Sequence, residues 1–82
     1  MLRPEVYDII NGERNYQERK WGTVEQHPHE VGGWILLMEK VLSDARREWT
    51  NSRGDDRALD ELRKVVALGV ACMEQHGAVP RS

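Results

Sequence analysis

Residues 65–73 read Val-Val-Ala-Leu-Gly-Val-Ala-Cys-Met, and this apolar stretch decides which folds are open to the chain. It is too short to cross a bilayer and has the length of a core helix segment. A helix that is apolar around its whole circumference has to be covered on all sides. Ala67, Gly69 and Ala71 are small enough for another helix to come close. The stretch therefore predicts a helix covered by its own chain and by a second subunit.

The helix that contains this stretch has predictable ends. Asp55 or Asp56 is expected as its N-cap, because a short acidic side chain accepts hydrogen bonds from free backbone N–H groups. The helix is predicted to run to about His76, since Gly77 is placed to terminate it. Residues 78–82 are expected to form a tail beyond the helix.

A second amphipathic helix is predicted from about Glu30 to Trp49. Its apolar residues recur at spacings of three and four, which is the period of a helix with one buried face. These residues are Val31, Trp34, Ile35, Met38, Val41, Leu42, Ala45 and Trp49. Asn, Ser and Gly between Thr50 and Asp55 indicate a turn. Residues 30–77 are therefore expected to form a helical hairpin.

The N-terminal part, residues 1–29, is predicted to be a short helical arm and a connector. The arm spans Pro4–Lys20, with Pro4 at a favourable first helical position. The arm is either continuous or broken near Asn11-Gly12, because glycine costs a helix interior about 1 kcal/mol relative to alanine. The connector, Trp21–His29, has no clear hydrophobic period. The predicted fold class is all-α, with a short N-terminal arm and two long antiparallel helices in one domain.

Length and composition point to an oligomer in a reducing compartment. A chain of 82 residues buries only about 60–65% of its unfolded surface, so association is a common way to stabilise it. Cys72 is the only cysteine, which excludes an internal disulfide. With 12 basic and 14 acidic residues the chain lacks the basic excess that general DNA or RNA binding needs. We expect a cytoplasmic homo-oligomer without a membrane segment.

Several short motifs resemble the opening of the small MazG-like proteins that bacteriophages often encode. The motifs are Glu13-Arg14, Gln17, Lys20-Trp21-Gly22 and His27-Pro28. Two later stretches, Trp34–Ala45 and Ala58–Glu74, match the helical pair that follows in that family. The resemblance implies an all-α nucleoside triphosphate pyrophosphohydrolase scaffold, which forms dimers or tetramers and binds Mg²⁺ through acidic residues.

The resemblance also implies two carboxylate pairs, and this sequence departs from both. In the family pattern, acids three residues apart share one helix face and bind hard cations together. The first pair falls at Val41 and Asp44, and the second at Glu61 and Lys64. Valine cannot bind a metal and lysine repels one, so Asp44 and Glu61 are left as remnant metal ligands. A shifted alignment would use Glu39, Glu48 and Asp60, which do not restore both pairs.

A ligand site is predicted on the arm instead. Its residues lie on one helix face, at i, i+3 and i+6, followed by an indole that can stack under a base. Two cations of the last helix could replace the metal as phosphate partners. The predicted ligand-binding residues are Arg14, Gln17, Lys20, Trp21, Arg63 and Lys64. The structural alternative is a solvated arm whose Trp21 packs on the body, with Lys64 paired to Asp60.

These features favour a non-catalytic binder of a phosphorylated nucleotide on a MazG-like helical scaffold. A phage protein of this kind could sequester a nucleotide, including a cyclic signal of host defence, in the host cytoplasm. Its partners would be itself and the nucleotide, and it would need no cofactor. Two alternatives stay open: an active Mg²⁺-dependent nucleoside triphosphate pyrophosphohydrolase, and a helical protein–protein interaction module.

Overall fold

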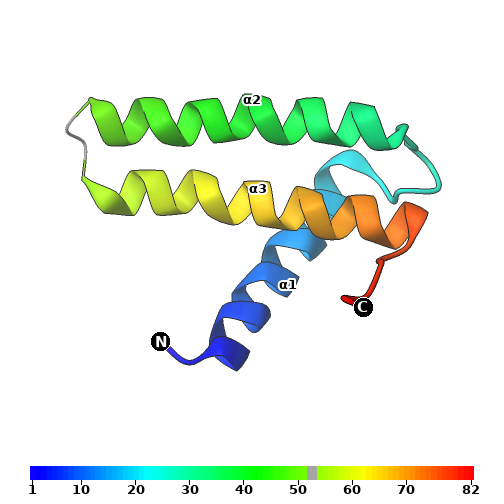
Figure 1. Ribbon diagram of the computed structural model, residues 1–82. Coiled ribbons are helices and arrows are strands. Elements are labelled where there is room, and N and C mark those ends of the chain that lie inside the picture. The colour runs from blue at the N-terminus through cyan, green and yellow to red at the C-terminus, as the bar shows by residue number, and fades with distance from the viewer. Residues whose placement is uncertain (52–53) are drawn as a thin grey trace.

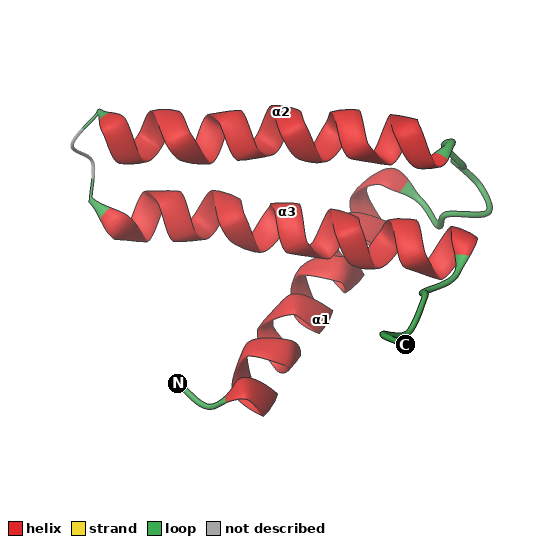
Figure 2. Cartoon of the chain, viewed as in Figure 1, coloured by secondary structure: helices red, strands yellow, loops and turns green. Residues whose placement is uncertain are grey.

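The computed structural model describes residues 1–51 and 54–82, and that part of the chain folds into three α-helices without a strand (Figures 1 and 2). The helices are α1 (Arg3–Trp21), α2 (Val31–Thr50) and α3 (Asp55–His76). α2 and α3 lie side by side as an antiparallel hairpin (Figure 1). α1 packs against α3 and crosses it obliquely, so that its N-terminal half projects away from the hairpin. The predicted all-α class is confirmed.

The first helix is longer and more regular than expected. α1 has 19 residues, against 20 in α2 and 22 in α3, so it is not a short arm. It runs without interruption through Gly12, where the sequence left a break open. Trp21 is the last helical residue, and Gly22 ends the helix with a φ of 94°. The packing of the C-terminal half of α1 on α3 stabilises the helix by more than Gly12 destabilises it.

Gly12 lies in the interior of α1, where a glycine lowers the stability of the helix. A Cβ atom added at Gly12 would meet nothing within 4 Å. Gly12→Ala is therefore expected to stabilise the protein by about 1 kcal/mol, because alanine loses less backbone entropy in a helix. Urea unfolding followed by circular dichroism would measure this gain. An unchanged or lower midpoint would show that α1 does not unfold together with the hairpin.

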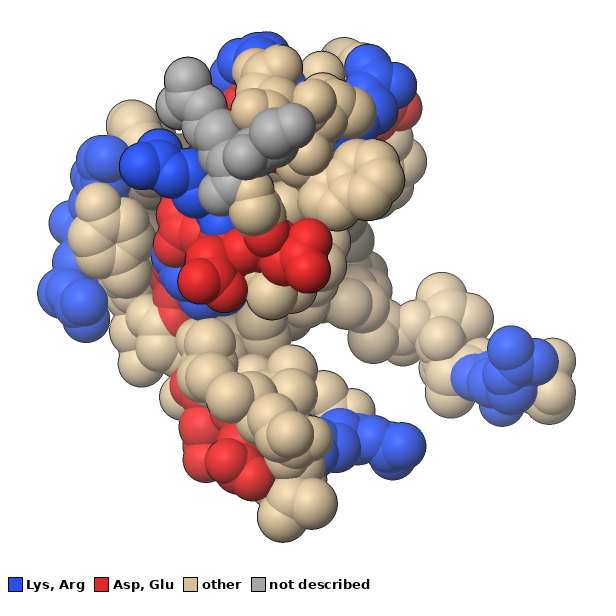
Figure 3. All heavy atoms as spheres, turned by 90° about the vertical axis from the view of Figure 1, so that its left-hand side faces the viewer, with Lys and Arg blue, Asp and Glu red and all other residues tan. Residues whose placement is uncertain are grey.

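The sequence predicted the C-terminal end of α3 correctly, but not its N-terminal cap. Gly77 terminates the helix with a φ of 96°, and its N–H donates to the Met73 carbonyl at 2.7 Å. At the other end, Gly54 occupies the cap position with a φ of 85°, and no side chain caps the helix. Asp55 and Asp56, expected as caps, lie in the first turn instead. There they are stabilised by the positive end of the helix dipole, and acidic side chains gather at this end of the molecule (Figure 3).

The predicted turn between the two long helices is narrower than expected. Thr50 is the last residue of α2 and Asp55 the first of α3, so both belong to helices. The middle of that turn, residues 52–53, lies outside the described residues. The start of α2 agrees with the prediction to within one residue, with Glu30 in the cap position.

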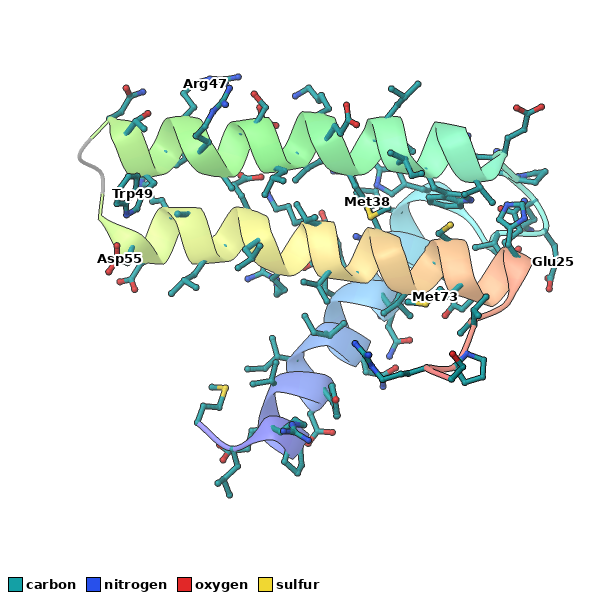
Figure 4. The ribbon with its side chains drawn as sticks, in the orientation of Figure 1. Glu25, Met38, Arg47, Trp49, Asp55 and Met73 are labelled. Atoms are coloured by element: carbon teal, nitrogen blue, oxygen red, sulfur yellow. The ribbon has the colours of Figure 1, made fainter. Side chains whose placement is uncertain are left out.

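The buried apolar core of the described residues is thin and consists of small side chains and one indole. Trp34 and Ala45 of α2 are buried, with 6% and 7% of their surface exposed. From α3, Ala67 and Ala71 are the most buried residues of the described chain, at 0% and 2%. Met38 points from α2 toward α3 (Figure 4), and its sulfur lies 3.5 Å from the position a Cβ would take at Gly69.

The apolar stretch 65–73 is covered mainly by its own chain. α1 crosses α3 where two polar contacts anchor it, one at Lys64 and one at Glu74. Ala67 and Ala71 lie on the same helix face between these contacts, so their small size allows α1 to approach. Val66 and Met73 remain 45% and 48% exposed. Within the monomer, therefore, only one stripe of this stretch is exposed, and the rest of its circumference is covered.

No helix in the described part of the chain combines the length and the hydrophobicity needed to cross a membrane. Many large apolar side chains are nevertheless exposed, on all three helices. They include Val6 and Ile9 on the projecting half of α1, and Leu2 at its N-cap position. Contiguous apolar surface of this kind marks an interaction site more often than chance exposure.

Candidate functional site

A groove of about 840 Å³ lies between the C-terminal half of α1, the connector and the hairpin. Its size falls in the range of sites for small organic ligands, which span roughly 300–1,000 Å³. Aromatic and aliphatic side chains form most of its wall: Tyr16, Trp21, His27, His29, Trp34, Leu37, Val41 and Leu68. The polar groups in the wall come from α1, the connector and α3. We call this the arm groove.

Five of the six predicted ligand-binding residues line the arm groove, namely Arg14, Gln17, Lys20, Trp21 and Lys64. The helix period brings the first three to one side of α1, and the crossing of α1 over α3 adds Lys64. Arg63 does not line the groove. The interpretation of the arm as a face of converging polar groups therefore agrees with the geometry, although the cations differ in what they contact.

Lys20 and Trp21 form the exposed end of the groove. The Lys20 ammonium lies 5.0 Å from the centre of the Trp21 ring and 5.8 Å from that of Tyr16. Trp21 is 64% exposed, so it does not pack into the body as the structural alternative required. A cation held beside an exposed aromatic ring is stabilised by the ring quadrupole and keeps hydrogen-bond donors free.

Gln17 lies deeper in the groove wall, with 9% of its surface exposed. Its Nε2 donates a long hydrogen bond of 3.4 Å to the backbone carbonyl of Lys64. The opposite amide orientation would place two oxygens against each other, so this contact assigns the orientation. Gln17 Oε1 is then buried and has no hydrogen-bond partner among the described residues. A buried acceptor without a partner costs free energy, so this oxygen gains by accepting a hydrogen bond.

Arg14 is the most deeply buried charged residue of the described chain, at 5% exposed. Its guanidinium donates to Glu74 Oε2 at 2.6 and 3.0 Å, and lies 3.4 Å from Glu18. The group that was predicted to hold a phosphate is thus engaged by carboxylates. Charge-assisted contacts of this length fasten α1 to α3 near the C-terminus of that helix.

Arg63 is engaged in the same way at the other edge of the crossing. It donates to Glu13 Oε1 of α1 at 2.7 Å and pairs with Asp60 at 2.7 Å. The hydrogen bond to Glu13 raises the pKa of Arg63, and the bond from Arg63 lowers the pKa of Asp60. Arg63 therefore clamps α1 onto α3 from outside the groove, and its predicted contact with a ligand phosphate is not supported.

The ammonium group of Lys64 lies next to acidic side chains. Its Nζ lies 3.0 Å from Glu61 Oε1 and 3.8 Å from Asp60. The hydrogen bond to Glu61 is the main cause that raises the pKa of Lys64, so the ammonium stays protonated at neutral pH. The ammonium thus occupies the place beside Glu61 that a divalent cation would need.

The remnant acids do not fit Mg²⁺. Lys40 and Arg47 hold Asp44 at 2.9 and 3.2 Å. The hydrogen bond from Lys40 is the first cause that lowers the Asp44 pKa. Val41 contributes an apolar wall to the groove. Within residues 1–51 and 54–82, no cluster of three His, Cys, Asp or Glu side chains is placed to hold a metal, whereas Mg²⁺ requires near-octahedral oxygen ligands.

A second polar network, which the sequence reasoning missed, supports the groove from its closed end. Trp34 Nε1 donates to Gln75 Oε1 at 2.8 Å, and Gln75 Nε2 donates to the His29 carbonyl at 2.7 Å. The His29 ring stands edge-on to Trp34, with 4.8 Å between ring centres. The network ties the connector to the end of α3. Its partners are more than 40 residues apart, so no local spacing predicts them.

No protein-family model matches this chain, and neither a curated protein nor a solved structure is significantly similar to it. The resemblance to MazG-like proteins therefore stays a prediction from short motifs.

Proposed function

We propose that this protein is a non-catalytic binder of a phosphorylated nucleotide, and that the arm groove is its binding site. One observation carries the proposal. The residues that carry an exposed indole, two ammonium groups and a buried amide oxygen without a described partner all line one groove, whose volume suits a nucleotide. These groups belong to Trp21, Lys20, Lys64 and Gln17.

Each of these side chains has a role that its chemistry supports. Trp21 offers a flat ring for the base, since stacking on an aromatic side chain accepts any base. Lys20 supplies charged donors to the phosphate, and Lys64 supplies those N–H groups that its hydrogen bond to Glu61 leaves free. Such hydrogen bonds are worth about 1.5–3 kcal/mol each. The oxygen of Gln17 would accept from an amino group of the base after a small shift of the side chains that cover it. Arg14 and Arg63 position α1 and do not contact the ligand.

The contacts of two acidic residues, Glu61 and Asp44, support binding without catalysis. Hydrolysis of a triphosphate by this class of scaffold uses Mg²⁺ to bridge phosphates and activate water. Here Lys64 neutralises Glu61, two cations engage Asp44, and Val41 offers no ligand. The active pyrophosphohydrolase alternative would need a metal site that these contacts oppose.

The finer parts of the proposal rest on the motif resemblance. We place the protein on a MazG-like scaffold that works as a homo-oligomer in the cytoplasm. If phage-encoded, it would sequester a nucleotide signal of host defence, cyclic nucleotides included. The second candidate function is a helical interaction module, which the exposed apolar surface of the hairpin favours.

Calorimetric titration with mono-, di-, triphosphate and cyclic nucleotides, with and without Mg²⁺, tests the proposal. We expect binding that does not depend on Mg²⁺ and no release of pyrophosphate. Trp21→Ala, Lys20→Ala and Lys64→Ala should each weaken binding about ten-fold or more. Lys40→Ala is the matched control, because Lys40 is an exposed lysine of α2 that pairs with Asp44 outside the groove.

Two results would contradict this function. If no nucleotide binds the wild type more tightly than about 1 mM, the interaction-module candidate is favoured. Mg²⁺-dependent pyrophosphate release that Asp44→Ala or Glu61→Ala abolishes would instead favour the enzyme. Circular dichroism of each variant separates lost affinity from lost folding, since a folded Trp21→Ala protein that binds like the wild type also counts against the site.

A further inference from the structure

The hairpin has a broad apolar face that its own chain leaves uncovered. Four residues of α2 recur at i, i+4, i+11 and i+18, and four of α3 at i, i+3, i+7 and i+14, so each set forms one stripe. All eight are between 42% and 63% exposed: Val31, Ile35, Leu42, Trp49, Leu59, Leu62, Val66 and Met73. We call this surface the open face.

The open face is hollowed near the turn and lies away from α1. A groove of about 670 Å³ runs between α2 and α3 there, lined by Leu42, Trp49, Leu59 and Leu62. Trp49 lies at the turn end of the hairpin, near Asp55 (Figure 4). The residues of α3 that contact α1, such as Lys64 and Glu74, lie on another side of the helix. The face and the arm groove are therefore separate surfaces.

Two opposite charges are placed symmetrically on the open face. Glu39 and Arg46 line the same groove, three residues before and four residues after Leu42. They are seven residues apart, so they project from the same side of α2 as Leu42. Neither makes an ion pair within the part of the chain that the structure describes. Unpaired charges of opposite sign on either side of an apolar centre make the surface complementary to itself.

We propose that the open face binds a second copy of this chain about a two-fold axis that crosses α2 near Leu42. Such an axis sets each hairpin antiparallel on its partner, which makes the contact isologous. Glu39 then faces the partner's Arg46, and Arg46 faces the partner's Glu39. This inference names the surface of the proposed homo-oligomer, and it requires no ligand.

The same axis pairs Leu59, Val66 and Met73 of α3 with apolar residues of the partner. Met38 lies opposite Gly69 in the hairpin, and the two helices run antiparallel, so Leu42 is level with residue 65. An axis there sets Val66 near the partner's Val66. Leu59 and Met73 lie seven residues before and after Val66, so Leu59 faces the partner's Met73. Two helices of about 30 Å in length, packed side by side, give the open face an area of roughly 600 Å² per copy. Two such faces reach about 1,200 Å², the lower bound of a stable interface.

Sedimentation velocity at micromolar concentration tests the interface. The wild type should sediment as a dimer, and Leu42→Glu as a folded monomer, because two carboxylates would meet at the axis. Leu36→Glu is the control: Leu36 is a leucine of α2, 67% exposed, that lies outside the open face, and this variant should stay dimeric. A monomeric wild type, or equal dissociation of the two variants, would overturn the proposal.

Charge reversal tests the symmetry itself. Glu39→Arg and Arg46→Glu should each weaken dimerisation about ten-fold or more, because each replaces two attractive contacts by two repulsive ones. The double variant restores both pairs and should dimerise like the wild type. A double variant as weak as either single one would overturn the two-fold arrangement. Nucleotide binding by a monomeric Leu42→Glu protein would leave the proposed function standing while the dimer is measured separately.

Discussion

Trp34→Ala is expected to lower the free energy of unfolding by about 3–5 kcal/mol, the largest loss among single substitutions on α2. Trp34 is the largest of the buried apolar side chains, at 6% exposed, so its removal leaves a cavity between the helices. It also leaves Gln75 Oε1 without the indole donor at 2.8 Å. Denaturant unfolding followed by circular dichroism would measure the loss.

Two further variants separate packing from hydrogen bonding at this site. Trp34→Phe keeps an aromatic ring but removes the donor, so it should cost about 1–2 kcal/mol more than an exposed substitution. Trp21→Ala is the exposed control, because Trp21 is 64% exposed, and it should change stability by less than about 1 kcal/mol. Equal losses for Trp34→Ala and Trp21→Ala would contradict the assignment of Trp34 to the core.

Glu74→Ala is expected to destabilise the protein by about 2–4 kcal/mol, because it strands the buried guanidinium of Arg14. Arg14 is 5% exposed and bonds Glu74 at 2.6 Å, whereas Glu18 lies at 3.4 Å. Removing the closer carboxylate therefore leaves a charge with little solvent and one weak partner. Urea unfolding at neutral pH would detect the shift.

Glu18→Ala provides the matched control, since both glutamates contact the same guanidinium and their side chains are similarly exposed, at 43% and 41%. Its loss should stay below about 1 kcal/mol, the range of an exposed i,i+4 pair. A larger effect of Glu18→Ala than of Glu74→Ala would show that α1 is not fastened to α3 through Glu74. Both variants keep Lys20 and Trp21, so nucleotide binding by the folded proteins should persist.

The helices themselves were predictable from local rules. The spacing of three and four in residues 31–49 and the glycine at position 77 locate α2 and the end of α3, because periodicity and backbone freedom are local properties. The prediction was wrong at the start of α3, where Gly54 caps in place of an aspartate. At Asn11-Gly12 the sequence left a continuous and a broken helix open, and α1 is continuous because one glycine costs less than the packing of a whole helix contributes.

The arm groove was predictable in part. Arg14, Gln17 and Lys20 share a face of α1 because of helix geometry alone, and that face does line the groove. The choice of partner for each cation was not predictable. Arg14 bonds Glu74 across 60 residues and Arg63 bonds Glu13 across 50. Charged side chains select partners within a few ångströms, so their contacts depend on where α1 crosses α3.

By itself, then, the sequence determined which segments are helical and which side of α2 is apolar. Only the tertiary structure decided which apolar stripe is covered and which is open. Ala67 and Ala71 are buried because α1 crosses over them, while Val66 on the neighbouring side stays exposed. The crossing angle of two helices comes from the fit of many side chains at once. That fit brought Arg14 to Glu74 and Arg63 to Glu13, and it placed Lys20, Trp21 and Lys64 along one groove.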